Sequence, residues 1–138
     1  MNIGAIESAF SRALEFTVPT LTVLKATDDA TVPPDHSYVL VDVERCENLV
    51  GNLWKATVVA SVLTPAPLYS ESDHNEVVRA VMALFTQEGQ QTLYDRYTSY
   101  STPLGHTCGG GKLLYADADP DGNNYRHNVA ILLGLVAS

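Results

Sequence analysis

Residues 53–63 read LWKATVVASVL, and this pattern is the clearest indication of the fold in the chain. Alternate positions from Trp54 to Val62 are apolar, and the positions between them include Lys55, Thr57 and Ser61. Strict alternation predicts a β-strand with one face buried against a core.

A second strand is predicted just before it. Tyr38–Glu44 reads YVLVDVE, which is rich in β-branched residues and of strand length. A polar connection follows, and Gly51-Asn52 can adopt the positive φ of a tight turn. We therefore expect an antiparallel hairpin, with Leu21–Leu24 as a short edge strand and a loop over Thr27–Asp35, where Pro33 and Pro34 lie.

Apolar residues at three- and four-residue steps predict helices on both sides of the hairpin. The first helix covers about residues 3–16 and cannot continue through Pro19. After Pro65 and Pro67 end the strand, cap residues at 70–73 begin a second helix, with Asp73 and Glu76 resembling a capping box. Its apolar stripe, which we expect to lie across the Trp54 face, is Val77, Val78, Val81, Met82 and Phe85. A shorter helix after Gly89 carries Leu93, Tyr94 and Tyr97.

The C-terminal third predicts a second pair of strands. Gly109–Gly111 is expected to break the chain, Lys112–Ala116 to form a strand and Asp117–Asn124 to form a turn-rich loop. Tyr125–Val136 is apolar on both faces. It should therefore be central in the sheet or covered by another subunit.

This order of elements predicts one α+β domain over residues 1–138, with a small antiparallel β-sheet of four to five strands and two or three helices packed on one face. The chain is 46% hydrophobic and 17% charged, which is ordinary for a globular protein. The other face of the sheet then needs solvent or a partner.

The charge excludes several classes of function. The formal net charge is −8, and the eight basic residues are scattered. Such a chain repels nucleic acid and anionic lipid, so we expect neither specific DNA binding nor a membrane role. The first residues lack the basic and apolar parts of a secretory signal, and Val129–Ala137 is too short to span a bilayer.

One acidic motif resembles half of a calcium loop. Asp117, Asp119 and Asp121 alternate before Gly122, as calcium ligands do. The twelfth position would be Asn128, which lacks a bidentate carboxylate, and Pro120 interrupts the motif. We interpret the segment as a hairpin turn, with cation binding left open.

A thiol nucleophile is the alternative chemistry. His106 and Cys108 precede three glycines whose amides could stabilise an oxyanion, although no third orienting group is legible. Lys112 after those glycines fails as a phosphate loop, because Leu113 stands where serine or threonine is required.

No other catalytic, cofactor or metal motif is present, so no site residue of these kinds is assigned. The four histidines, His36, His74, His106 and His127, lie far apart in sequence without zinc-ligand spacing. Cys46 and Cys108 are expected to be free thiols. The tyrosines Tyr94, Tyr97 and Tyr100 fit a binding surface and core packing equally well.

The most specific local piece of the pattern is GNLWKATVVA, residues 51–60, followed by a helix that bears His74 and runs to Phe85. With the N-terminal helix and the closing strand, this order resembles the phage tail terminator and minor tail protein families over residues 3–136. The Gly109–Gly111 stretch and the Asp117–Asn124 loop depart from that pattern.

The resemblance implies a non-enzymatic virion protein of a tailed phage. Such a protein forms a homo-oligomeric, hexameric ring that ends the tail tube and joins it to the head, at the neck, with a channel through which DNA passes without specific binding. Its partners are the tail tube and the head-closure or connector proteins, and it occupies the host cytoplasm during assembly. The alternatives are another neck component, a small ligand-binding or enzymatic domain that uses His106 and Cys108, and an interaction module of unknown partner.

Overall fold

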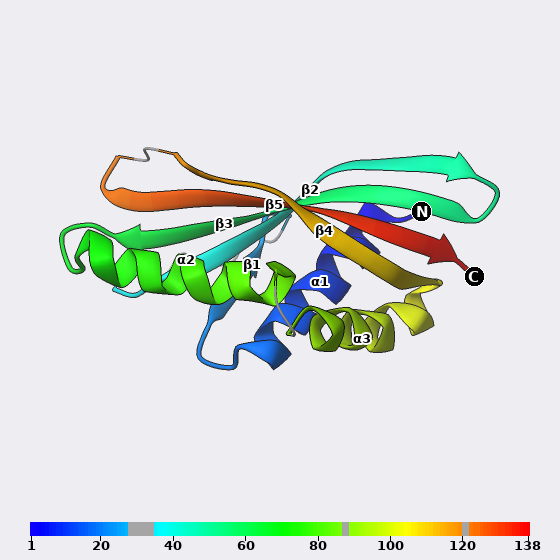
Figure 1. Ribbon diagram of the computed structural model, residues 1–138, viewed down its shortest axis with the longest axis horizontal. Helices are drawn as coiled ribbons and strands as arrows, with labels where there is room; N and C mark the ends of the chain where they lie inside the picture. Colours follow the sequence, from blue (N-terminus) through cyan, green and yellow to red (C-terminus); the bar gives the residue numbers. More distant parts are fainter. Residues whose placement is uncertain (28–34, 87–88, 120–121) are drawn as a thin grey trace.

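The computed structural model describes residues 1–27, 35–86, 89–119 and 122–138, which form three helices and one sheet (Figure 1). The helices are α1 (Ile3–Thr17), α2 (Glu71–Thr86) and α3 (Gly89–Ser101), followed by a short 3-10 turn, Thr102–Leu104. The strands are β1 (Thr22–Lys25), β2 (Tyr38–Val50), β3 (Leu53–Pro65), β4 (His106–Ala118) and β5 (Asn124–Ala137).

The sheet has five strands in the order β1-β2-β3-β5-β4. All neighbours pair antiparallel except β1, which lies parallel to β2 and pairs Thr22 with Tyr38. The predicted α+β class is confirmed, with a mixed sheet in place of a purely antiparallel one. The predicted loop before β2 lies mostly outside the described residues.

The β2–β3 hairpin is longer than the sequence predicts. β2 continues to Val50 because the polar residues after Glu44 remain paired to β3, with irregular register at two points. Gly51 alone supplies the positive φ of the turn, at 54°. Asn48 donates its side-chain N–H groups to the carbonyls of Gly51 and Leu53, at 3.0 and 3.2 Å. The hairpin therefore extends as an arm with a defined tip.

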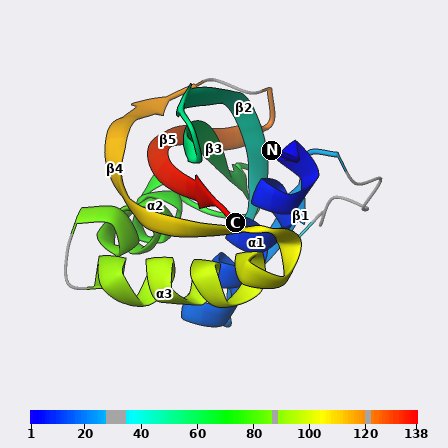
Figure 2. The ribbon, with the colours of Figure 1, turned by 90° about the vertical axis from the view of Figure 1, so that its right-hand side faces the viewer.

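All three helices lie on one face of the sheet, which curls around them (Figure 2). The inward side chains of β3, β5 and the helices form one buried core, in which Phe10 and Phe85 stack with ring centroids 6.0 Å apart. As predicted, α2 contacts the inner face of β3 and β5. Trp54 is half-buried against this core.

The capping box of α2 lies three residues earlier than predicted. Ser70 Oγ accepts from the Asp73 amide at 3.2 Å, and Asp73 Oδ2 accepts from the Ser70 amide at 3.0 Å. The reciprocal pair is thus Ser70 with Asp73, and Glu76 lies a turn further along the helix.

The prediction that Gly109–Gly111 breaks the chain is wrong, because these glycines lie inside β4. The register with β5 shifts between Cys108 and Gly110, and Gly110 has a φ of 142°. A bulge absorbs the glycines and the strand continues. A second shift, between Leu113 and Tyr115, bulges Leu114.

β5 is central, as predicted, since it pairs with β3 on one side and β4 on the other. Val129, Ile131, Leu133 and Leu135 are buried on its inner face. The outer face carries Leu132, Gly134 and Val136, and no helix of the described chain covers it. The outer face is therefore where the fold leaves apolar surface available.

Candidate interaction surface

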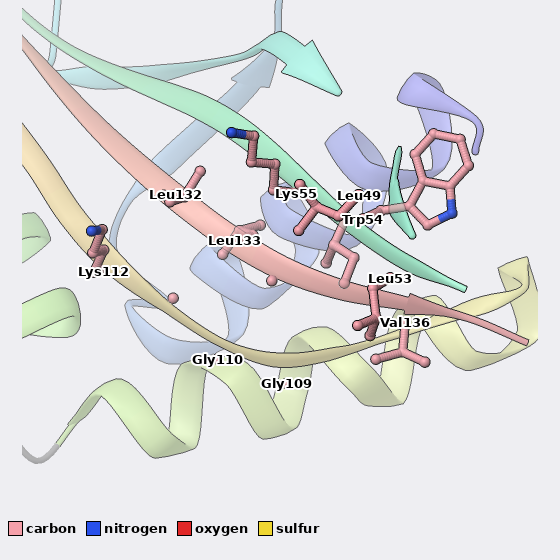
Figure 3. A pocket seen from close by; sticks show the side chains of 13 residues that line it. Leu49, Leu53, Trp54, Lys55, Gly109, Gly110, Lys112, Leu132, Leu133 and Val136 are labelled. Carbon is pink, nitrogen blue, oxygen red and sulfur yellow. The ribbon is translucent and has the colours of Figure 1, made fainter. Parts of the chain in front are cut away.

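A groove of about 510 Å³ opens on the sheet beside the tip of the β2–β3 hairpin. Leu49 from β2, Leu53 from β3 and Val136 from β5 gather at one end of it, and Leu132 and Lys112 lie at the other (Figure 3). Four strands thus contribute to one apolar concavity, within the size range of roughly 300–1,000 Å³ that binding clefts occupy.

Glycines form part of the groove wall. Gly110 on β4 and Gly134 on β5 are register partners and have no side chains, so backbone is exposed between Leu132 and Val136. A Cβ at Gly134 would approach the Gly110 carbonyl only to 3.8 Å, an ordinary contact. The glycine at position 134 therefore leaves open space in the groove, and no close backbone contact requires a glycine there.

Apolar side chains near the groove are exposed. Val50 at the hairpin tip is 67% exposed and Leu49 is 56% exposed. Leu53 and Val136, which are neighbours across β3 and β5, are also exposed. Contiguous exposed apolar residues of this kind mark interaction sites on soluble domains.

The charge of the groove is opposite to that of the chain. Among the described residues, its lining includes Lys55 and Lys112 and no aspartate or glutamate, and Lys55 Nζ lies 3.6 Å from the carboxylate of Glu47 beside the groove. Lys112 lies directly across from Leu132, and Lys55 directly across from Gly134. In a chain with 16 acidic and eight basic residues, a lysine-bordered apolar groove favours an apolar partner segment with acidic flanks.

The opposite end of the sheet is polar and internally bonded. His74 of α2 is 1% exposed, and its Nδ1 lies 2.8 Å from the Thr64 hydroxyl. Its Nε2 lies 2.8 Å from Nδ1 of His127 on β5. Burial, with His127 as the smaller cause, lowers the pKa of His74 to about 4. His74 is therefore neutral at pH 7, donating through one nitrogen and accepting through the other.

The Asp117 segment is not arranged as a calcium loop in its described part. Asn128 donates its amide N–H to Asp119 at 3.0 Å, and the Arg126 guanidinium lies 3.7 Å from the same carboxylate. A cationic group thus already compensates Asp119, whereas Asp117 is exposed. Asp121 lies outside the described residues. A hollow of about 310 Å³ lies beside Asp119 and His74.

His106 and Cys108 are not poised as a nucleophile pair. Burial raises the pKa of Cys108 to about 11, and its Sγ donates to the Gly110 carbonyl at 3.3 Å. His106 is buried against Tyr97, with 2.6 Å between Nε2 and the phenol oxygen, and burial lowers its pKa. A thiol nucleophile requires a lowered thiol pKa, so the geometry opposes that reading.

The remaining predicted groups serve packing. Tyr94 and Tyr97 are buried in the core, and Tyr100 lies beneath the Arg12 guanidinium at 4.2 Å, so core packing rather than a binding surface describes the tyrosines. Cys46 and Cys108 are free thiols, as predicted.

Sequence reasoning missed the contact between His74 and His127, which are far apart in sequence and meet because α2 packs against β5. It also missed the groove, whose lining comes from four strands. Among the described residues, no group of three or more histidine, cysteine, aspartate or glutamate side chains could hold a metal ion. No helix in that part of the chain is long and apolar enough to cross a membrane.

Comparison with known proteins gives similarity in structure only. No family model matches the sequence, and no curated protein matches it. A chain described as "Virion of native gene transfer agent (GTA) particle" superposes with a TM-score of 0.60 and 16% identity, over 97% of this chain and 96% of that one. A protein whose name states no function superposes with a TM-score of 0.57 and 16% identity, over 100% and 96%. The fold is thus shared from end to end with a chain of a virion particle.

Proposed function

We propose that this protein is a structural component of a phage-like virion, and that it forms a ring that terminates the tail tube and joins it to the head. The observation that carries the proposal is the match in fold with a chain of a gene transfer agent virion, which covers nearly all of both chains.

The surface of the molecule supports this proposal. The lysine-bordered groove and the exposed hairpin tip are suited to protein contacts, and no catalytic arrangement accompanies them among the described residues. We propose that the protein acts through these surfaces and not through catalysis. Its partners would be further copies of itself, the tail tube and the head-closure or connector proteins.

The acidity of the chain fits a DNA channel. Each copy carries a formal charge of −8, and a hexamer concentrates six times that charge around one axis. Negative potential in the lumen repels DNA phosphates and keeps the passing duplex from binding. The protein would act in the host cytoplasm during assembly and remain in the mature virion.

Size-exclusion chromatography with light scattering, followed by negative-stain imaging, tests the ring. We expect a hexamer mass at high protein concentration and annular particles in the images. Mixing the protein with tail tubes assembled from the tube protein of the same genome tests the position. Density at one end of each tube, with an end to tube growth, is the expected result.

Two outcomes would replace the proposal. Binding to head-completion proteins without any effect on tubes would identify a different neck component. A monomer that turns over a small-molecule substrate, with loss of activity in Cys108→Ser, would instead identify an enzyme.

A further inference from the structure

The molecule carries an apolar groove at one end and an apolar projection at the other. β3 begins at Leu53, which lines the groove, and ends at Pro65, beyond which the chain turns towards α2. Leu68 lies in this turn and is 60% exposed. A strand of this length spans about 40 Å, so groove and projection lie at opposite ends of the sheet (Figure 1).

The projecting turn is held in shape by its own bonds. The amides of Leu68 and Tyr69 both donate to the Pro65 carbonyl, at 3.2 and 3.1 Å. The Tyr69 hydroxyl donates to the Asp35 carbonyl at 2.8 Å. Leu68 is therefore presented on an ordered turn, which lowers the entropy lost when a partner covers it.

The two ends are also complementary in charge. Glu71 and Asp73 follow Leu68 in the first turn of α2, and both are exposed. The groove instead carries Lys55 and Lys112 at its border. An apolar side chain flanked by carboxylates thus matches an apolar groove flanked by ammonium groups.

We propose that the groove of one copy receives the Leu68 turn of a second copy. Leu68 fills the space above Gly134, and the acidic start of α2 lies near the lysines of the groove. This inference rests on the proposed function, because it names the surfaces through which the ring forms.

The symmetry of such a contact follows from its two different halves. Each copy offers one turn and one groove, so every added copy leaves a free groove at one end of the assembly and a free turn at the other. A contact of this heterologous type closes into a ring when the rotation between copies permits, whereas a contact between identical patches stops at a dimer.

Two variants separate the halves of the contact. Gly134→Val fills part of the groove. Its Cβ would have only an ordinary contact at 3.8 Å within the fold, and valine suits a strand. Leu68→Asp removes the projection at an exposed site. Leu104→Asp is the matched control, since Leu104 is similarly exposed at 49% and lies outside both surfaces.

The experiment measures mass by light scattering and thermal unfolding for the wild type, the three variants and an equimolar mixture of Gly134→Val with Leu68→Asp. We expect rings from the wild type and from Leu104→Asp. Gly134→Val and Leu68→Asp should each be monomeric with unfolding temperatures close to that of the wild type. Their mixture should form a dimer and nothing larger, because it contains one intact turn and one intact groove.

The outcomes discriminate between this inference and the proposed function. A wild type that remains monomeric at every concentration and on tail tubes overturns the proposed function and, with it, this contact. Wild-type rings that persist in both Gly134→Val and Leu68→Asp overturn only the contact, and so does a mixture without dimers. If Gly134→Val unfolds, Leu132→Asp, which places a carboxylate in the same apolar groove, takes its place in the mixture.

Discussion

The two ends of β5 are built in opposite ways. At its start, Arg126, His127 and Asn128 bond to groups on β3, on α2 and directly after the end of β4, so these side chains have partners within the chain. Towards its other end, Leu132, Gly134 and Val136 line an open groove. The apolar side chains at this end of β5 therefore need another protein to cover them, whereas the polar side chains at the start of β5 do not.

The largest expected effect on stability comes from placing a charge on the inner face of β5, compared with the same charge on its outer face. Leu133 is fully buried, whereas Leu132 is half-buried in the groove. Leu133→Asp places an unpaired carboxylate in the core and should cost more than about 4 kcal/mol, a large share of the roughly 5–15 kcal/mol that stabilises a typical domain.

Leu132→Asp is the matched control and should change the free energy of unfolding by less than about 1 kcal/mol, while preventing assembly. Urea denaturation followed by circular dichroism measures the free energy of unfolding of both variants, and light scattering measures their assembly. A soluble, folded Leu133→Asp protein that still assembles would contradict the placement of the core.

Alternation and helical spacing were enough to predict the fold class. The 53–63 pattern gave the strand, its buried face and the hairpin, because burial on one face imposes a two-residue period. The glycines at 109–111 misled, because a run of glycine favours a loop when considered alone. In the folded chain they lie in a bulge held between β5 and α3, a tertiary contact that no local pattern encodes.

The polar end should respond to acid. The pKa of His74 is lowered from 6.5 to about 4 by burial, so below pH 6.5 the unfolded chain binds a proton that the folded chain does not. The contribution of His74 to the free energy of unfolding is therefore complete above pH 6.5. It is lost as the pH falls towards 4, which lowers the free energy of unfolding by about 3 kcal/mol at most. His106, whose pKa is also lowered, adds to the loss in the same direction.

Denaturation at pH 7.5, 6.0 and 4.5 measures this dependence. His74→Gln should be less stable than the wild type at pH 7.5, because it loses hydrogen bonds. Its free energy of unfolding should, however, change less with pH. An unchanged slope in His74→Gln would show that the buried pair does not control the response.

The glycines of β4 should differ according to what surrounds them. A Cβ at Gly111 would lie 2.7 Å from both the Leu132 carbonyl and the Tyr94 hydroxyl, whereas a Cβ at Gly109 would lie 3.9 Å from the Gly134 carbonyl. Gly111→Ala should therefore cost about 1–3 kcal/mol, and Gly109→Ala should be close to neutral. Thermal unfolding of the two variants gives the comparison, and equal losses would argue against close packing at Gly111.

The groove itself could not be predicted from the sequence. Its side chains come from residues 49–55, 109–112 and 132–136, and only the strand order brings them together. The acidic motif and the His106–Cys108 pair could be recognised in the sequence because their residues are close together in the chain. In its described part, the folded structure does not arrange either of them for calcium binding or nucleophilic catalysis, whereas the groove forms only through long-range strand pairing.

The smallest expected effect concerns the polar end again, at the capping box that starts α2. Ser70→Ala removes the hydroxyl that accepts from the Asp73 amide and should cost about 1 kcal/mol. Ser72 is an exposed serine in the first turn of α2, two residues after Ser70. Ser72→Ala should be neutral or slightly stabilising, because alanine favours helices. Thermal unfolding distinguishes the two.

The loss of stability in Ser70→Ala can also be compared between low and high protein concentration. Because Ser70 and Asp73 satisfy each other within one chain, the loss in Ser70→Ala should be the same at low and high protein concentration. A loss that grew as copies associate would show that the Ser70 hydroxyl itself takes part in the contact between copies, in addition to the Leu68 side chain and the carboxylates that follow it.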